Sequence, residues 1–188
     1  MDTVLNERQI EELVARLARE IAIEHQHLMV VGLLKGCLPF MADLSRALCR
    51  CGVRLEMGFM RAKSYFGDRS SGHVQLEELM GLTVADKDVL VVDDILDTGH
   101  TLRKMHNFLA DRGARQVRTC VLLQKEGHNN GVVADYVGTT IADMFVVGYG
   151  LDYRECYREL PHIAALGEEE RAAVDCGSDP LLLEAGHG

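Results

Sequence analysis

Apolar residues follow two patterns along the chain, helical spacing and short continuous runs. Between Ile10 and Ile21 they recur every three or four positions, which predicts an amphipathic helix over residues 7–25. Asn6, with Gln9 three residues later, is the signature of a capping box, in which each side chain accepts a hydrogen bond from the other residue's backbone N–H. The helix is therefore expected to begin directly after Asn6.

Four short segments predict strands, and the most apolar of them are typical of strands buried in a parallel sheet. These segments are residues 28–34, 53–60, 88–94 and 116–125. Helices are expected over residues 39–52, with Pro39 in the first turn, and over residues 101–113, which Gly113 closes. A strand, a helix and a strand in succession form a βαβ unit, so we expect an α/β fold with a mostly parallel sheet.

The remaining segments carry weaker patterns. Residues 61–83 are polar and rich in Gly and Ser, which indicates a mobile lid loop that contains a short strand or hairpin; a disordered insertion is the alternative. Residues 145–153 follow a loop region and end the patterned core. We expect a single domain over residues 1–166, and a short helix with a loose C-terminal tail over residues 167–188.

Composition limits the possible functions. The chain has 188 residues and a net charge of −9, which argues against broad nucleic-acid binding. No secretion signal or membrane-spanning apolar run is apparent, so a soluble, cytoplasmic protein without membrane contact is expected.

The cysteines show no zinc-type spacing, and we expect reduced thiols that mostly serve in packing. They are Cys37, Cys49, Cys51, Cys120, Cys156 and Cys176.

Candidate ligand-binding residues lie at the end of the strand predicted over residues 88–94. Asp93 and Asp94 lie where parallel sheets bind ligands, and adjacent strand residues point to opposite faces, so the carboxylates need not crowd each other. If both were ionised and ~4 Å apart, their repulsion would be about 4 kcal/mol near a protein surface. A divalent cation, a sugar diol or a cationic transition state could offset that repulsion.

The next five residues, Asp97 to Thr101, predict an anion-binding loop. Their backbone N–H groups open a helix, Gly99 permits a positive φ, and the hydroxyls of Thr98 and Thr101 add donors. A phosphate would fit there, although the Walker loop pattern is absent. The alternative is a plain helix start in which Asp97 or Thr98 is the N-cap.

One ligand would satisfy both features. An activated phosphoribose presents a phosphate to the loop, a diol to Asp93 and Asp94, and a carbon that becomes positive near Asp97. It also carries magnesium on its pyrophosphate.

Four segments together resemble the type I phosphoribosyltransferases, in particular the hypoxanthine–guanine branch. The segments are LLKG at 33–36, KSY at 63–65, VVDDILDTGHT at 91–101 and FVVGYGLDY at 145–153. The resemblance covers nearly the whole chain and implies a twisted, mostly parallel sheet flanked by helices, with a small hood and a mobile lid. It implies transfer of the 5-phosphoribosyl group from phosphoribosyl pyrophosphate to hypoxanthine and guanine in purine salvage, giving IMP or GMP and pyrophosphate.

The resemblance also assigns residues to the pyrophosphate group. Lys35 and Gly36 would form the pyrophosphate loop, where the family often has a cis peptide before the lysine. Ser64 and Tyr65 would close over the ligand, and Arg158 would clamp the pyrophosphate. The 5′-phosphate would rest on the loop from Asp97 to Thr101, in which we give the His100 side chain only a peripheral role.

The purine would bind beside these groups. Lys125 would donate to the purine O6, Phe145 would stack on the ring and Val146 would offer backbone groups to its edge. Asp152, next to the base, would hold Mg²⁺ directly or through water, with Asp93 and Asp94 as further water-mediated ligands. Asp97 would accept the N7 proton or stabilise positive charge on the purine.

Plainer interpretations exist for several of these residues. Lys35, Lys125 and Arg158 could be solvated side chains, and Phe145 and Val146 could be ordinary core residues.

One departure concerns Asp93, because the hypoxanthine–guanine branch often has Glu there. The shorter acid is expected to reach the diol through water. Xanthine–guanine enzymes use the same Asp-Asp pair, so a xanthine–guanine phosphoribosyltransferase is one alternative. A non-catalytic regulator that senses phosphoribosyl pyrophosphate is another, although the chain lacks the expected basic face. The family also suggests a homodimer or homotetramer.

Overall fold

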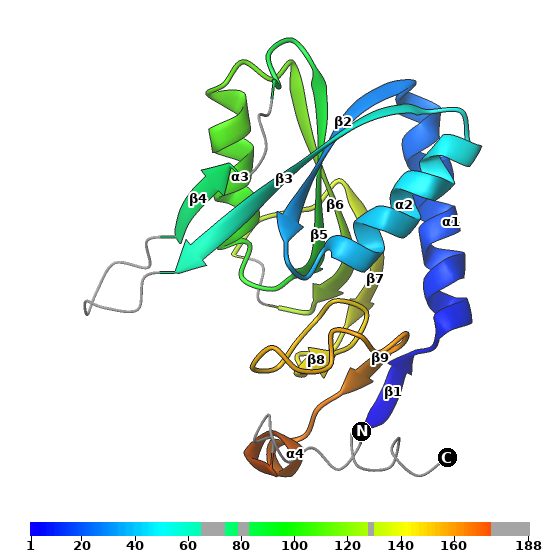
Figure 1. The fold of residues 1–188 in the computed structure, drawn as a ribbon, viewed down its shortest axis with the longest axis vertical. Coiled ribbons are helices and arrows are strands. Elements are labelled where there is room, and N and C mark those ends of the chain that lie inside the picture. The colour runs from blue at the N-terminus through cyan, green and yellow to red at the C-terminus, as the bar shows by residue number, and fades with distance from the viewer. Residues whose placement is uncertain (65–73, 79–82, 128–129, 174–188) are drawn as a thin grey trace.

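The computed structural model describes residues 1–64, 74–78, 83–127 and 130–173. These ranges contain two sheets and four helices, and the larger sheet runs through the centre of the molecule (Figure 1). The expected α/β fold is confirmed.

The central sheet has the strand order β4-β3-β2-β5-β6-β7. Its members are β2 (His27–Leu34), β3 (Arg54–Ser64), β4 (Val74–Glu78), β5 (Asp88–Leu96), β6 (Gln116–Lys125) and β7 (Tyr136–Ile141). Five of them are parallel, and only the edge strand β4 runs antiparallel, against β3. Because β2, β5 and β6 are adjacent and parallel, their carboxyl ends meet at one edge of the sheet.

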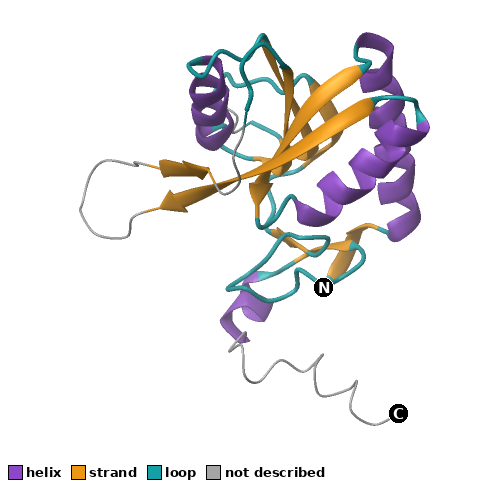
Figure 2. Ribbon diagram, turned by 45° about the horizontal axis from the view of Figure 1, so that its top comes forward, coloured by secondary structure: helices purple, strands orange, loops and turns teal. Residues whose placement is uncertain are grey.

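Helices cover both faces of this sheet (Figure 2). α1 (Glu7–Glu24) and α2 (Leu38–Arg50) pack in the same apolar cluster as alternate residues of β2 and β5. α3 (His100–Ala110) packs against the opposite face. Leu90 and Val91, neighbours in β5, fall into these two separate clusters, which is why the strands are apolar on both faces.

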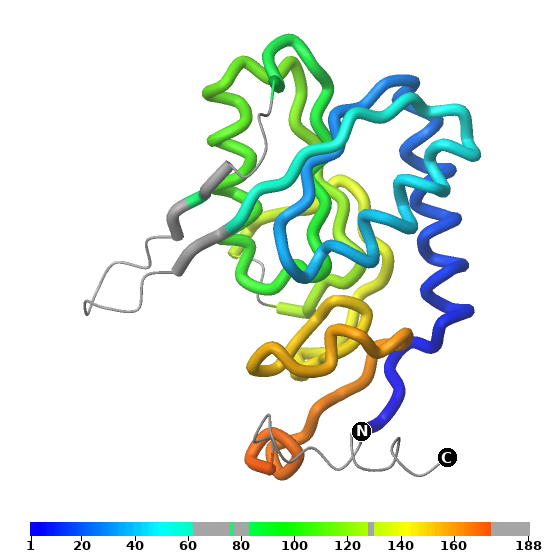
Figure 3. The backbone as a smooth tube through the Cα atoms, viewed as in Figure 1, coloured from blue at the N-terminus to red at the C-terminus, as the bar shows by residue number. Residues whose placement is uncertain are grey.

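A second, three-stranded antiparallel sheet forms the small hood that the resemblance implies. It consists of β1 (Asp2–Leu5), β9 (Ile163–Ala165) and β8 (Val146–Val147), in that order. The N-terminal segment thus runs beside a strand more than 150 residues later in the chain (Figure 3). The final helix, α4 (Glu168–Ala173), follows β9, and the Met1 amino group donates to Glu170 Oε1 at 2.6 Å.

Several predicted bounds need correction. β3 continues to Ser64 because it pairs with β4, and this hairpin is the one expected within residues 61–83. α3 ends at Ala110, and Gly113 (φ 80°) closes the turn after it. The region before residue 145 contains β7, which the sequence interpretation took for a loop, and β1 was not predicted. The expected mobile lid and the loose tail fall largely on residues 65–73, 79–82 and 174–188, outside the described residues.

The cysteines agree only partly with the prediction. Cys37 and Cys120 are buried, and burial raises the pKa of both thiols. Cys49 and Cys51 are exposed, so they do not serve in packing, because α2 ends beside them at the surface. None of the five cysteines in the described ranges forms a disulfide, and Cys176 lies outside those ranges. Among the described helices, none is long and apolar enough to cross a membrane.

The capping box at the start of α1 gives a test of the fold. The Gln9 N–H donates to Asn6 Oδ1 and the Asn6 N–H donates to Gln9 Oε1, each at 2.9 Å. We predict that Asn6→Ala lowers the free energy of unfolding by about 1 kcal/mol, measured by urea titration. Asn107→Ala, on the exposed side of α3, is the control and should change it by less than about 0.5 kcal/mol. Equal losses in both variants would contradict the role of the box.

Candidate active site

The predicted residues gather at the carboxyl ends of three adjacent strands. Lys35 directly follows β2, Asp93 and Asp94 lie near the end of β5, and Lys125 is the last residue of β6. Asp97 lies in the loop between β5 and α3. The topology therefore brings together residues that lie up to 90 positions apart in sequence.

Asp93 and Asp94 form an acidic pair in which Asp93 is buried and Asp94 is half-buried. Asp93 is 7% exposed, and its Oδ1 accepts a hydrogen bond from the Asp94 N–H at 3.0 Å. Burial raises the pKa of Asp93 well above its ordinary range, and the neighbouring charge of Asp94 raises it further. Burial also raises the pKa of Asp94, although the Ile95 N–H, at 2.8 Å from Asp94 Oδ1, favours its ionised form. Adjacent strand residues were expected to keep the two carboxylates apart, but the charge of Asp94 still affects the pKa of Asp93. A proton on Asp93 would relieve their repulsion.

Two glycines allow loops from distant parts of the chain to close on this pair. A side chain at Gly36 would collide with the Asp94 carboxylate. A side chain at Gly150, whose φ is +99°, would collide with the carbonyl oxygen of Gly36. The loop after β2 therefore lies between Asp94 and the turn after β8. The peptide bond between Leu34 and Lys35 is cis, as the resemblance implies.

The loop between β5 and α3 has the features of an anion-binding helix start. Gly99, with φ 75°, is the N-cap of α3, and it contributes no side-chain cap. The hydrogen bonds of α3 begin at Arg103, whose backbone N–H donates to Gly99 O at 3.0 Å. The alternative in which Asp97 or Thr98 is the N-cap is therefore wrong. The N–H groups of His100 and Thr101 remain among the helix donors that a ligand can satisfy.

The side chains of this loop differ in exposure. Thr98 and His100 are exposed and Thr101 is half-buried, so the loop is open to solvent on one side. Asn130 supports it from the segment after β6, because its side-chain amide donates to Thr98 O at 3.1 Å. Arg103 in turn donates to Asn130 O at 2.9 Å.

Lys125 links the loop after β5 to the segment before β8. Its Nζ lies 3.3 Å from Asp97 Oδ2 and 3.2 Å from Asp143 Oδ1. The lysine side chain is only 13% exposed, so the interpretation of Lys125 as a solvated strand-end residue is wrong. Lys125, which is predicted to bind the purine O6, thus lies directly beside Asp97, which is predicted to accept the purine N7 proton.

Phe145 lies between the lysine and the hood. Its ring meets Tyr153 edge to face, with centroids 5.5 Å apart, and Arg171 Cζ lies 5.3 Å from the Phe145 centroid. Phe145, Lys125 and Asp143 line one cavity of about 460 Å³ that also reaches α4. Val146 differs from Phe145, because its side chain is 5% exposed and belongs to the core, which leaves only its backbone for contact with a ligand.

A charged network surrounds the turn after β8. Arg158 donates to Gly150 O at 2.7 Å and forms an ion pair with Asp152 Oδ1 at 2.8 Å. The Glu155 N–H donates to Asp152 Oδ2 at 2.8 Å. Arg158 is not a solvated surface residue, since its side chain is 26% exposed. Its buried Nε has no hydrogen-bond acceptor among the described residues.

Glu155 joins the two basic residues that the resemblance assigns to pyrophosphate. Its Oε2 lies 2.8 Å from Lys35 Nζ, and its Oε1 lies 3.3 Å from Arg158 Nη2. Sequence reasoning missed this residue, and likewise Asp143 and Gly150. The Gly-Tyr-Gly pattern at residues 148–150 was a usable signal for Gly150, but no local pattern pointed to either acid.

Two predicted residues cannot be placed by their side chains. Ser64 is the last residue of β3, and its backbone pairs with Val74; its side chain and the whole of Tyr65 lie outside the described residues.

A metal site built from protein ligands alone is absent from the described part of the chain, where no three His, Cys, Asp or Glu residues cluster suitably. Asp152 fits a metal that arrives with a ligand, because its carboxylate is 29% exposed and Mg²⁺ often takes one or two carboxylates together with phosphate oxygens.

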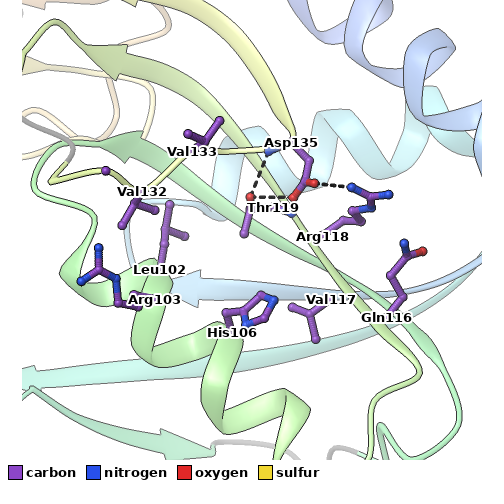
Figure 4. Close-up of a pocket in the computed structure, with 11 residues that line it drawn as sticks. Leu102, Arg103, His106, Gln116, Val117, Arg118, Thr119, Val132, Val133 and Asp135 are labelled. Atoms are coloured by element: carbon purple, nitrogen blue, oxygen red, sulfur yellow. Dashed lines mark hydrogen bonds and ion pairs between the residues drawn. The ribbon is translucent and has the colours of Figure 1, made fainter.

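A cavity of about 490 Å³ lies away from these residues (Figure 4). It is lined by residues of α3, β6 and the segment before β7, with Arg118 donating to Asp135 at 2.6 Å on one side. It contains none of the predicted site residues.

Comparisons with known proteins agree with this geometry. The family model of the phosphoribosyl transferase domain matches residues 1–154. The hypoxanthine-guanine phosphoribosyltransferase of Staphylococcus aureus (strain COL) is 39% identical over 172 residues, covering 89% of this chain and 94% of that protein. The bifunctional protein TilS/HprT of Listeria monocytogenes (serovar 1/2a) is 42% identical over 170 residues, covering 88% of this chain. The chain spans only 26% of the length of that bifunctional relative.

Solved structures show the same fold. Hypoxanthine phosphoribosyltransferase from Trypanosoma cruzi in complex with the product IMP has a TM-score of 0.83 and 36% identity, covering 90% of this chain and 95% of that one. The enzyme from Staphylococcus aureus has a TM-score of 0.82 and 39% identity, covering 90% and 92%.

The acidic pair gives a prediction of pH dependence. Above the ordinary Asp pKa of 3.8, the folded chain keeps a proton on Asp93 that the unfolded chain has lost. The free energy of unfolding therefore falls as the pH rises through this window, since the folded state binds more protons. Asp93→Asn keeps the acceptor for the Asp94 N–H and removes the ionisation. We expect the variant to match the wild type near pH 3.5 and to exceed its stability by a growing margin as the pH rises above 3.8, measured by denaturant unfolding. A constant difference across this range would contradict the raised pKa.

Proposed function

The chain belongs to the phosphoribosyltransferase family, and on that premise we propose that it is a hypoxanthine–guanine phosphoribosyltransferase of purine salvage. The reaction moves the 5-phosphoribosyl group from phosphoribosyl pyrophosphate to hypoxanthine or guanine, and the products are IMP or GMP and pyrophosphate. The observation that carries the proposal is the position of Lys125 Nζ, 3.3 Å from Asp97 Oδ2, in the loop that leads into a helix start without a side-chain cap.

The ribose end of the substrate binds along β5 and the loop after it. Backbone N–H groups from Asp97 to Thr101 receive the 5′-phosphate, and the positive end of the α3 dipole adds to the attraction. The hydroxyls of Thr98 and Thr101 are the side-chain donors there. The diol donates to Asp94 directly and to Asp93 through water, because Asp93 is one methylene shorter than the Glu that the family often has there.

The pyrophosphate binds on the opposite side of the acidic pair. Lys35 and the backbone of Gly36 bind it from the loop after β2, and Arg158 clamps it from the turn after β8. Ser64 and Tyr65 close over it from the β3–β4 hairpin and exclude water.

The residues present fit a magnesium ion that enters with the pyrophosphate. Asp152 would hold it directly or through water, with Asp93 and Asp94 as outer ligands. When bound, Mg²⁺ neutralises charge on the departing pyrophosphate.

The base binds between the hood and the end of β6. Phe145 stacks on the purine, Lys125 donates to O6, and the backbone of Val146 meets the base edge beside Asp152. A purine nitrogen attacks C1′ of the ribose while the C1′–oxygen bond to pyrophosphate breaks. Positive charge develops on the ribose and the base, and Asp97 accepts the N7 proton or stabilises that charge.

Further parts of the proposal rest on the relatives. We propose a cytoplasmic location, supported by the free thiols among the described cysteines. A homodimer or homotetramer is also proposed, supported by a solved Trypanosoma cruzi enzyme studied for its oligomeric state. Residues 1–166 are proposed as the phosphoribosyltransferase domain, since the family model covers most of them.

The proposal predicts a pattern of substrates. Purified protein with Mg²⁺ and phosphoribosyl pyrophosphate should release pyrophosphate with hypoxanthine and guanine, and much less with adenine, which lacks the O6 that Lys125 binds. A coupled pyrophosphate assay measures all four common purines, including xanthine. Failure to release pyrophosphate with any of the four bases would support the non-catalytic regulator instead, and a preference for xanthine would support the xanthine–guanine enzyme.

Asp97 and Asp143 provide a matched pair of variants, because both carboxylates contact Lys125 Nζ. We expect Asp97→Asn to lower kcat about 100-fold or more, the usual contribution of a group that handles a proton. Its KM for phosphoribosyl pyrophosphate should change much less. Asp143→Asn also removes one carboxylate from Lys125 but should lower kcat less than tenfold. Similar losses in both variants would mean that Asp97 acts only by holding the lysine.

A further inference from the structure

Glu155 forms ion pairs with Lys35 and Arg158, the two cations that the proposed function assigns to pyrophosphate. One carboxylate oxygen lies 2.8 Å from Lys35 Nζ and the other lies 3.3 Å from Arg158 Nη2. These contacts lower the pKa of the glutamate, chiefly through the Lys35 hydrogen bond and then through Arg158. The carboxylate is therefore ionised and neutralises part of the charge on two basic groups from different loops.

These ion pairs are poorly suited to hold the fold together. The side chains of Lys35 and Glu155 are 63% and 64% exposed, and exposed pairs contribute little to stability. A contact of this kind is readily replaced by a more highly charged anion with the same geometry. Pyrophosphate presents such oxygens, and it carries more charge than one carboxylate.

The backbone places Glu155 in this position at some cost. Tyr153 and Cys156 pair across a two-residue turn, and its central residues, Arg154 and Glu155, have φ values of 52° and 68°. Residues other than Gly, Asn and Asp rarely adopt this region. The Glu155 N–H is fixed by Asp152 Oδ2, the carboxylate proposed to meet magnesium. The turn thus directs the side chain toward the two cations.

We propose that Glu155 is a displaceable internal counter-ion, which pairs with Lys35 and Arg158 and must leave them when pyrophosphate binds. It then lowers the affinity for the pyrophosphate group, because its contacts are lost and its charge repels the ligand. The same effect favours the departure of pyrophosphate as a product. This inference rests on the proposed function for the identity of the ligand.

The test compares two variants that each remove one negative charge. Glu155→Gln preserves the shape of the side chain, and Glu159→Gln is the control, because Glu159 is exposed four residues away and has no ion pair in the described structure. Mg²⁺-pyrophosphate is titrated into each full-length protein by calorimetry, without any purine. We expect Glu155→Gln to bind it about three- to tenfold more tightly than the wild type. Glu159→Gln should stay within about twofold.

A second readout separates charge from a structural role. The advantage of Glu155→Gln should shrink as salt is raised, since the charges are exposed and screened. An unchanged or weaker affinity in this variant, an equal gain in Glu159→Gln, or no pyrophosphate binding by the wild type would overturn the proposal. The proposed function is judged separately, by nucleotide synthesis in the wild type. An active wild type with no gain in Glu155→Gln would refute only the role of Glu155.

Discussion

Two neighbouring carboxyl groups at the end of β5, one buried and one half-buried, are the constraint around which this site is arranged. Burial raises the pKa of Asp93 and of Asp94, which favours proton uptake by the pair and so lessens their repulsion. Gly36 must lack a side chain because it lies against Asp94, and Gly150 must lack one because it lies against Gly36. The acidic pair thereby determines how closely the loop after β2 and the turn after β8 approach each other.

The cations around this pair are each neutralised by an acid of the chain itself. Lys125 lies between Asp97 and Asp143, and Arg158 pairs with Asp152. A ligand that carries a phosphate, a diol and a pyrophosphate would therefore exchange existing contacts for new ones. Such exchange costs less than burying unpaired charges, and it lets binding remain reversible. Recognition then depends on the ligand's full set of groups, because Lys125 and Arg158 each already pair with a carboxylate of the chain.

Local sequence patterns predicted much of the fold, and the exceptions share a physical cause. The start of α1 and the whole of β6 agree with prediction, since a capping box and a long apolar run act over a few residues. β1 was missed because its four residues gain their order from pairing with β9, far away in sequence. β7 is a short edge strand containing Gly and Thr, and its order likewise comes from its neighbour β6.

The same division holds for the site. The phosphate loop, the acidic pair and the base-facing segment are contiguous in sequence, so motif and spacing were enough to locate Asp93, Asp97 and Lys125. The sequence could not show that Lys125 lies between Asp97 and Asp143, or that Glu155 lies between Lys35 and Arg158. Those contacts arise only when parallel strands bring their carboxyl ends together and the hood turn packs against them. Residue types determine which chemistry is available, and long-range packing determines which charges meet.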